Sequence, residues 1–113
     1  MKNVILGILS LAFIVVLAGC AKATDPKFRI HNERADKATV QIQTSGGNTI
    51  NINDVEAGQS TAFQTCAEGN IVATAVIQNE SLSPKILFFA VMDTRYTIVI
   101  LTGVVPALRV DRE

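Results

Sequence analysis

Few side chains of this sequence are suited to covalent or acid–base chemistry. The chain has one histidine, His31, and two cysteines, Cys20 and Cys66. A serine or cysteine nucleophile needs a base such as histidine beside it, so a hydrolytic site would have to combine His31 with a serine or with Cys66. The sequence has no Gly-x-Ser-x-Gly motif, and His31 falls on the polar side of a predicted strand. We therefore predict no catalytic residues, with an enzyme that uses His31 as the alternative.

The other cysteine, Cys20, ends a segment that has the features of an export signal. Lys2 is followed by an uncharged apolar run over residues 4–18. This run is shorter than the roughly 20 residues that a membrane span needs, and it fits the apolar region of a secretory signal. The sequence therefore predicts a cleaved signal peptide over residues 1–19. An uncleaved anchor is the alternative.

The residues at the expected cleavage site give Cys20 a chemical role. They read Leu17-Ala18-Gly19-Cys20 and resemble a bacterial lipobox. The resemblance implies cleavage between Gly19 and Cys20, and a diacylated Cys20 whose thiol carries the lipid as a thioether. A plain signal peptide with a chance cysteine is the alternative. Such a lipid holds a protein at a membrane without a spanning helix.

Lipidation of Cys20 would also determine the compartment of the protein and whether Cys66 can form an internal disulfide. The protein would lie in the cell envelope. In a bacterium with two membranes, the absence of Asp after Cys20 favours the outer membrane, facing the periplasm or the cell surface. Cys66 would then be the only free thiol in an oxidising compartment, so it would have no partner for an internal disulfide. We expect Cys66 to be a buried core residue, with an intermolecular disulfide or a reactive thiol as the alternative.

Metal, cofactor and nucleic-acid binding find little support in the sequence. It has no zinc-ligand spacing and no phosphate-binding glycine loop. Residues 51–56 are rich in oxygen ligands, yet they lack the acidic density and fixed glycine of a calcium loop. Lys plus Arg and Asp plus Glu both number 10, so the net charge is zero, whereas nucleic-acid binders carry a basic excess. We expect no metal, no cofactor and no nucleic-acid partner.

A neutral surface rich in amides is the remaining candidate for function. Gln41 and Gln43 alternate with apolar residues, and so do Asn51 and Asn53, which places their side chains on the polar face of two strands. Amide groups suit a protein partner or sugar hydroxyls. Exposed aromatic side chains for sugar stacking are expected to be scarce. The alternative is an ordinary solvated sheet face.

The elements that position these residues are predicted to be strands. From residue 28 on, apolar residues recur with a period of two, and turn residues interrupt them at intervals of about ten. With 49% hydrophobic residues in 113, the chain can bury one core. We predict an all-β domain over residues 28–113, an immunoglobulin-like or related two-sheet sandwich of seven or eight mostly antiparallel strands. A polar tether over 20–27 would precede it, and a small barrel is the alternative fold.

Two further residues and one segment carry specific expectations. Tyr96 opens an apolar strand, so we expect its ring in the core and its hydroxyl bonded across a corner. Gly58 lies in a predicted turn that favours a positive φ. Residues 86–92 form an apolar run, which predicts a strand that is buried on both faces.

The pattern from Phe28 to Gly103 resembles a family of secreted bacterial sandwich domains of unknown function. The similar motifs are Arg29-Ile30-His31-Asn32, Ala57-Gly58, and Tyr96-Thr97-Ile98-Val99 followed by Gly103. A periplasmic accessory protein of alginate O-acetylation has a similar two-sheet organisation. The resemblance implies the same fold and supplies no catalytic residues. Residues 33–37 replace a proline-rich segment of the family, so any binding function of that segment would be missing here.

These observations predict a non-enzymatic, membrane-anchored envelope lipoprotein that acts as a binding or interaction module. Its partners would be the membrane, through the lipid, and another envelope protein. The alternative is an accessory module associated with an envelope polysaccharide or exopolysaccharide.

Overall fold

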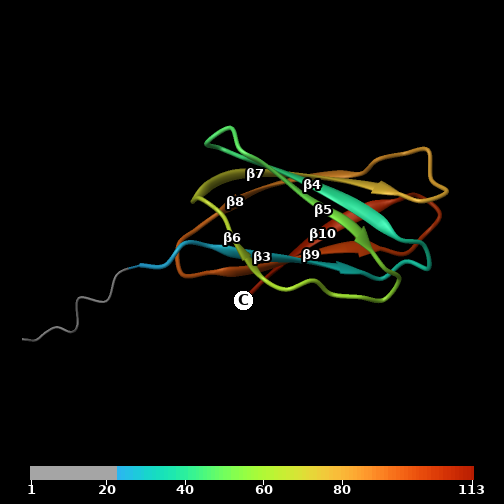
Figure 1. Cartoon of the computed structure of the whole chain (residues 1–113), viewed down its shortest axis with the longest axis horizontal. Coiled ribbons are helices and arrows are strands. Elements are labelled where there is room, and N and C mark those ends of the chain that lie inside the picture. The colour runs from blue at the N-terminus through green and yellow to red at the C-terminus, as the bar shows by residue number, and fades with distance from the viewer. Residues whose placement is uncertain (1–22) are drawn as a thin grey trace, which may run out of the picture.

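A computed structural model describes residues 23–113, which form a two-layer β-sandwich (Figure 1). One sheet has the strand order β10–β9–β3–β6, and the other has the order β5–β4–β7–β8. The prediction of an all-β sandwich of seven or eight mostly antiparallel strands is confirmed. The predicted signal peptide over 1–19, with Gly19 and Cys20, lies outside the described residues. The strands are β3 (Lys27–Asn32), β4 (Ala38–Thr44), β5 (Thr49–Val55), β6 (Gln64–Thr65), β7 (Gly69–Ile77), β8 (Lys85–Ala90), β9 (Arg95–Leu101) and β10 (Ala107–Arg112).

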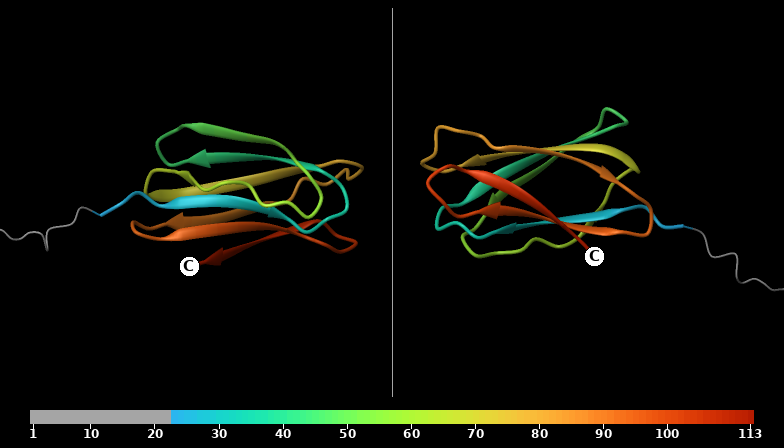
Figure 2. Two further views of the ribbon diagram at one scale, coloured as in Figure 1. Left: turned by 60° about the horizontal axis from the view of Figure 1, so that its bottom comes forward. Right: turned by 180° about the vertical axis from the view of Figure 1, so that it is seen from behind.

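The two sheets lie one above the other (Figure 2), and the core between them is built from alternate residues of their strands. In β3, Phe28 and Ile30 point inward, and in β4, Val40 and Ile42 do the same. This alternation follows from the strand geometry, which sends successive side chains to opposite faces. The pairing of β3 with β9 is parallel, whereas the other strand pairs are antiparallel.

Strand β8 corrects one expectation from the sequence. The run over residues 86–92 was predicted to be buried on both faces, but β8 is an edge strand, and Leu87 and Phe89 are 66% and 56% exposed. Only the alternate residues Ile86, Phe88 and Ala90 of β8 pack in the core. Apolar residues on both faces are also typical of a central strand, so the composition of the run could not reveal its position at the edge.

The segment before β3 is bound to the domain from Thr24 onward. The Thr24 backbone N–H and hydroxyl both donate to the Asp93 carboxylate, at 2.8 and 3.0 Å. The Asp93 N–H donates back to the Thr24 carbonyl at 2.9 Å. The bonds from the Thr24 N–H and hydroxyl lower the pKa of Asp93, because they stabilise its ionised form. The fold therefore begins close to the predicted lipidation site at Cys20.

Tyr96 joins the core to the turn between β8 and β9, as predicted. Its side chain is 3% exposed, and its ring packs against Phe88 with centroids 5.0 Å apart. Its hydroxyl accepts from the Val91 N–H at 2.9 Å and lies 3.4 Å from the Phe89 carbonyl, to which it can donate. The ring therefore fills the core while the hydroxyl fixes the turn.

Gly58 occupies the predicted left-handed position, with a φ of +73°. Its N–H donates to the Asn32 carbonyl at 2.7 Å, which ties the turn to β3. An added Cβ would meet nothing within 4 Å. A side chain at this position is therefore disfavoured by the backbone conformation and not by a steric clash. We expect Gly58→Val to lower the free energy of unfolding by about 1–3 kcal/mol, because β-branched residues are strained at positive φ.

Gly46→Val is the matched control for this prediction. Gly46 lies in another turn, has open space around it and has no positive φ. Urea unfolding of both variants gives the comparison. Equal midpoints for the Gly46→Val and Gly58→Val proteins would contradict the proposed backbone strain.

Candidate functional site

The four amide side chains singled out in the sequence lie together on the outer face of the sheet β5–β4–β7–β8. Gln41 of β4 is opposite Asn51 of β5, and Gln43 is opposite Thr49. Asn53 follows on β5, beside the irregularity in the pairing of β4 and β5. Gln41, Gln43, Asn51 and Asn53 are all exposed. We call this surface the amide face.

The amide face continues into an apolar area on β7 and β8. In the pairing register, the row that contains Gln43 continues through Val72 to Leu87. Phe89 lies opposite Asn70 on the same outer face. Sequence reasoning missed Leu87 and Phe89 because it treated the run as buried. Phe89 is therefore an exposed aromatic side chain, a kind that the sequence predicted to be scarce, and it lies at the edge of the face.

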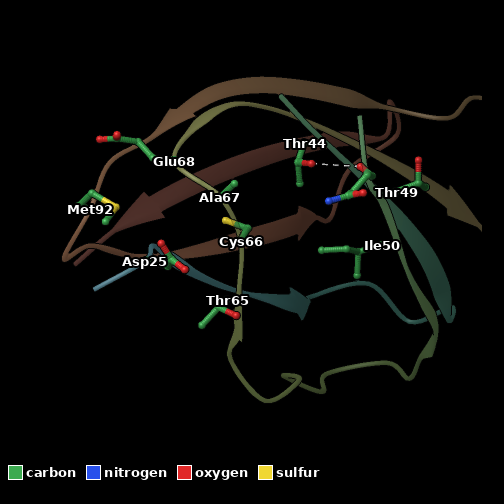
Figure 3. Close-up of a pocket in the computed structure, with 10 residues that line it drawn as sticks. Asp25, Thr44, Thr49, Ile50, Thr65, Cys66, Ala67, Glu68 and Met92 are labelled. Atoms are coloured by element: carbon green, nitrogen blue, oxygen red, sulfur yellow. Dashed lines mark hydrogen bonds between the residues drawn. The ribbon is translucent and has the colours of Figure 1, made fainter. Parts of the chain in front are cut away.

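A separate cavity of about 680 Å³ opens near the start of the domain (Figure 3). Its wall includes the carboxylates of Asp25 and Glu68 together with Thr and Asn side chains, and it has no lysine, arginine or histidine among the described residues. Such a lining favours a neutral or positively charged ligand with hydroxyl groups. Figure 3 shows Cys66 in the middle of the lining residues, with Asp25 and Met92 on one side of it and Thr44 and Ile50 on the other.

Cys66 is the free cysteine of the described residues, and it is buried, with 7% of its surface exposed. Its N–H donates to the Pro26 carbonyl at 3.0 Å. Burial raises the pKa of the thiol, and the negative charge of Asp25 raises it further, because both disfavour the thiolate. The structure therefore confirms the expected core position of Cys66 and keeps its thiol protonated at neutral pH.

The outer face of the other sheet carries charged residues and His31. The His31 Nδ1 lies 2.7 Å from the Ser60 hydroxyl, in a shallow hollow that Arg29 and Arg109 also line. His31 and Ser60 are opposite each other in an isolated antiparallel bridge, so strand pairing alone brings them together. Sequence reasoning missed this pair because nothing in the sequence matches Ser60 to His31 across 29 residues.

The His31–Ser60 pair lacks a third group to orient it. Within residues 23–113, no carboxylate is hydrogen-bonded to His31; the nearby Asp111 instead forms two bonds with Arg109, at 2.8 and 3.0 Å. A serine nucleophile depends on a base that is itself oriented by a third group. The geometry therefore gives no specific support to a nucleophilic site, and the prediction of no catalytic residues stays a prediction.

Across residues 23–113, no three His, Cys, Asp or Glu side chains come together in a way that would hold a metal ion. The same part of the chain has no helix with the length and apolar character needed to cross a membrane.

Comparison with known proteins shows the fold and no family. No protein-family model matches the chain, and a search of curated proteins finds no match. Among solved structures, the chain is similar to the NMR structure of a protein from Eubacterium rectale, with a TM-score of 0.58 and 15% identity. The match covers 78% of this chain and 87% of that one. At this identity the likeness shows a shared fold, and the class of protein that it supports is a β-sandwich domain.

Proposed function

We propose that this protein is a lipid-anchored binding module of the bacterial cell envelope, with no catalytic activity. Its binding surface is the amide face together with the exposed Leu87 and Phe89 beside it. The observation that carries the proposal is this juxtaposition of uncharged amides and exposed apolar side chains on a rigid sheet. Protein interfaces combine aromatic and apolar side chains with polar groups, and large exposed apolar side chains gathered on one face mark interaction sites.

The start of the fold supports attachment close to a membrane. Thr24 is fixed to the domain by Asp93, and the four residues from Cys20 to Thr24 span at most about 14 Å. A lipid on Cys20 would therefore hold the Asp93 end of the sandwich near the bilayer. Phe89 lies only four residues before Asp93, so the apolar part of the binding surface would be at the membrane end.

A variant of the proposed lipidation site tests the anchor. We expect Cys20→Ser to abolish fatty-acid labelling and to move the protein from the membrane fraction to the soluble fraction, because the thioether can no longer form. Cys66→Ser is the control, since Cys66 lies in the core and should leave labelling intact. A Cys20→Ser protein that stays labelled and membrane-bound would refute the anchor.

A polysaccharide ligand is the second candidate, and one observation favours it. The exposed ring of Phe89 lies opposite Asn70, which places an aromatic surface on which a sugar could stack beside an amide that could bond its hydroxyl groups. Binding of purified envelope polysaccharide to the isolated protein, lost in a Phe89→Ala variant and retained in Arg109→Ala on the opposite sheet, would favour this candidate. Absence of binding across a glycan panel would contradict the polysaccharide candidate and leave a protein partner as the proposed ligand.

A further inference from the structure

The edge strand β8 differs from the other three edges of the two sheets. Edge strands expose unpaired backbone groups, and proteins protect them with short length, charges, proline or bulges. Strand β6 has two residues, β10 carries Arg109, Asp111 and Arg112, and β5 contains the irregularity beside Asn53. Strand β8 has six residues of sequence KILFFA and carries a single charge, at its first residue. It is therefore the least protected edge of the described fold.

The register of β8 shows which of its backbone groups point outward. The Ala75 N–H donates to the Pro84 carbonyl, and backbone direction alternates along an antiparallel strand. Even-numbered residues from Pro84 on therefore bond to β7, while Lys85, Leu87 and Phe89 direct their N–H and C=O groups away from it. The right-hand view of Figure 2 shows β8 at the edge, with β10 of the other sheet crossing below it.

The outward-facing residues of β8 are complementary to themselves. If a second β8 is aligned antiparallel with Leu87 opposite Leu87, then Lys85 of each copy lies opposite Phe89 of the other. The two leucines then pack together, and each ammonium group meets an aromatic ring, a favourable cation–π pair. No like charges face each other in this register. All three outward-facing residues of both copies are paired.

The remaining backbone groups also fit this register. Tyr96 already contacts the Phe89 carbonyl, at 3.4 Å, but a carbonyl oxygen has a second lone pair. On the inner side of the strand, Ile86 of one copy would lie opposite Phe88 of the other, and both are half-buried apolar residues at the edge of the core. The pairing would therefore extend the core as well as the sheet.

We infer that two copies of this protein associate through antiparallel pairing of β8 with β8, centred on Leu87. The product is one continuous eight-stranded sheet, with the strand order β5–β4–β7–β8 followed by its two-fold mate. The two amide faces then lie on the same side of this sheet, so the dimer presents the amide face twice, with Leu87 and Phe89 of both copies between the two faces. The inference is argued from the edge of the sheet. Because the two β8 strands run in opposite directions, the Asp93 ends of the two copies point away from each other, so two anchored copies would lie with their strands along the bilayer.

Engineered cysteines test the register directly. Opposite residues of a hydrogen-bonded pair have Cα atoms about 5.5 Å apart, within the range that a disulfide bridges. In the protein isolated from expressing cells in mild detergent, we expect Leu87→Cys to form a covalent dimer on mild oxidation, seen by non-reducing electrophoresis. Gln43→Cys, exposed on the same face but two strands from the edge, and the unmodified protein are the controls. A mixture of Lys85→Cys and Phe89→Cys chains should cross-link to each other, and each alone should not.

A charge substitution tests the association without cross-linking. Leu87→Lys puts two ammonium groups opposite each other, so we expect it to convert a dimer to a monomer in sedimentation velocity at concentrations where the unmodified protein is dimeric. Leu87 is 66% exposed, and an unchanged circular dichroism spectrum would show that the variant folds. A monomeric unmodified protein, or a dimer that Leu87→Lys leaves intact, would overturn the inference. Neither result would touch the proposed anchor, which Cys20→Ser tests separately.

Discussion

Asn32→Ala is expected to destabilise the domain by about 3–5 kcal/mol, because each buried polar group left without a partner costs about 1–3 kcal/mol. Asn32 is fully buried. Its side-chain amide donates to the Asp36 and Val55 carbonyls, at 2.8 and 3.0 Å, and its oxygen accepts from the Arg34 N–H at 2.9 Å. Alanine leaves these three backbone groups without their bonds.

The same substitution loosens the loops at the end of β3. Arg34, which Asn32 helps to place, donates to the Leu101 and Gly103 carbonyls at 2.9 and 3.2 Å. It also forms an ion pair with Glu80, at 2.8 Å. One arginine thereby connects three loops of the sandwich. The loss of Asn32 is therefore expected to lower the protection of these loops from hydrogen exchange as well as global stability.

Asn51→Ala is the matched control for Asn32→Ala, because Asn51 is an exposed asparagine on the amide face. Its effect on the free energy of unfolding should lie within about 0.5 kcal/mol. Urea titration followed by circular dichroism measures both. Equal losses in the two variants would show that the buried hydrogen bonds of Asn32 do not matter.

Phe28→Ala is the second large effect, with an expected loss of about 3–5 kcal/mol, the range typical of deleting a buried phenylalanine. Phe28, the second residue of β3, is 1% exposed and packs in the core between the sheets. The substitution removes apolar area and leaves a cavity that close-packed neighbours fill only in part. Because domains have a total stability of about 5–15 kcal/mol, we expect a large drop in the unfolding temperature.

Phe89→Ala provides the comparison, since Phe89 is also a strand phenylalanine but is 56% exposed. It should change stability by less than about 0.5 kcal/mol. The stability of both variants should be measured at low protein concentration, where association through β8 does not contribute to the free energy of unfolding. A Phe89→Ala loss as large as that of Phe28→Ala would contradict the edge position of β8.

The two phenylalanines also show how far the sequence predicts this fold. The period-two pattern around Phe28 predicts its inward position, because polar residues alternate with it. The run that contains Phe89 has apolar residues on both faces, and only the arrangement of strands in space decides that one face meets solvent. Residue patterns therefore predict the strands and turns, as at Gly58 and Tyr96, but not which strand forms an edge.

The candidate site, like the fold, can be predicted from the sequence only in part. The shared face of Gln41 and Asn51 follows from alternation within each strand and a short turn between the strands, which is local information. The apolar neighbours Leu87 and Phe89 join that face through the pairing of β8 with β7. The proximity of His31 and Ser60 depends on a bridge between distant segments. Contacts of this kind depend on tertiary pairing, for which no sequence pattern gives the register.

Site-specific photo-cross-linking in intact cells tests the central claim most directly. A photoreactive residue at position 41 lies on the amide face, and one at position 109 lies on the outer face of the opposite sheet. We predict a discrete adduct with an envelope component from position 41, none from position 109, and loss of the adduct when Cys20→Ser is added. Adducts from position 109 alone, or none from position 41, would contradict a lipid-anchored module that binds through its amide face.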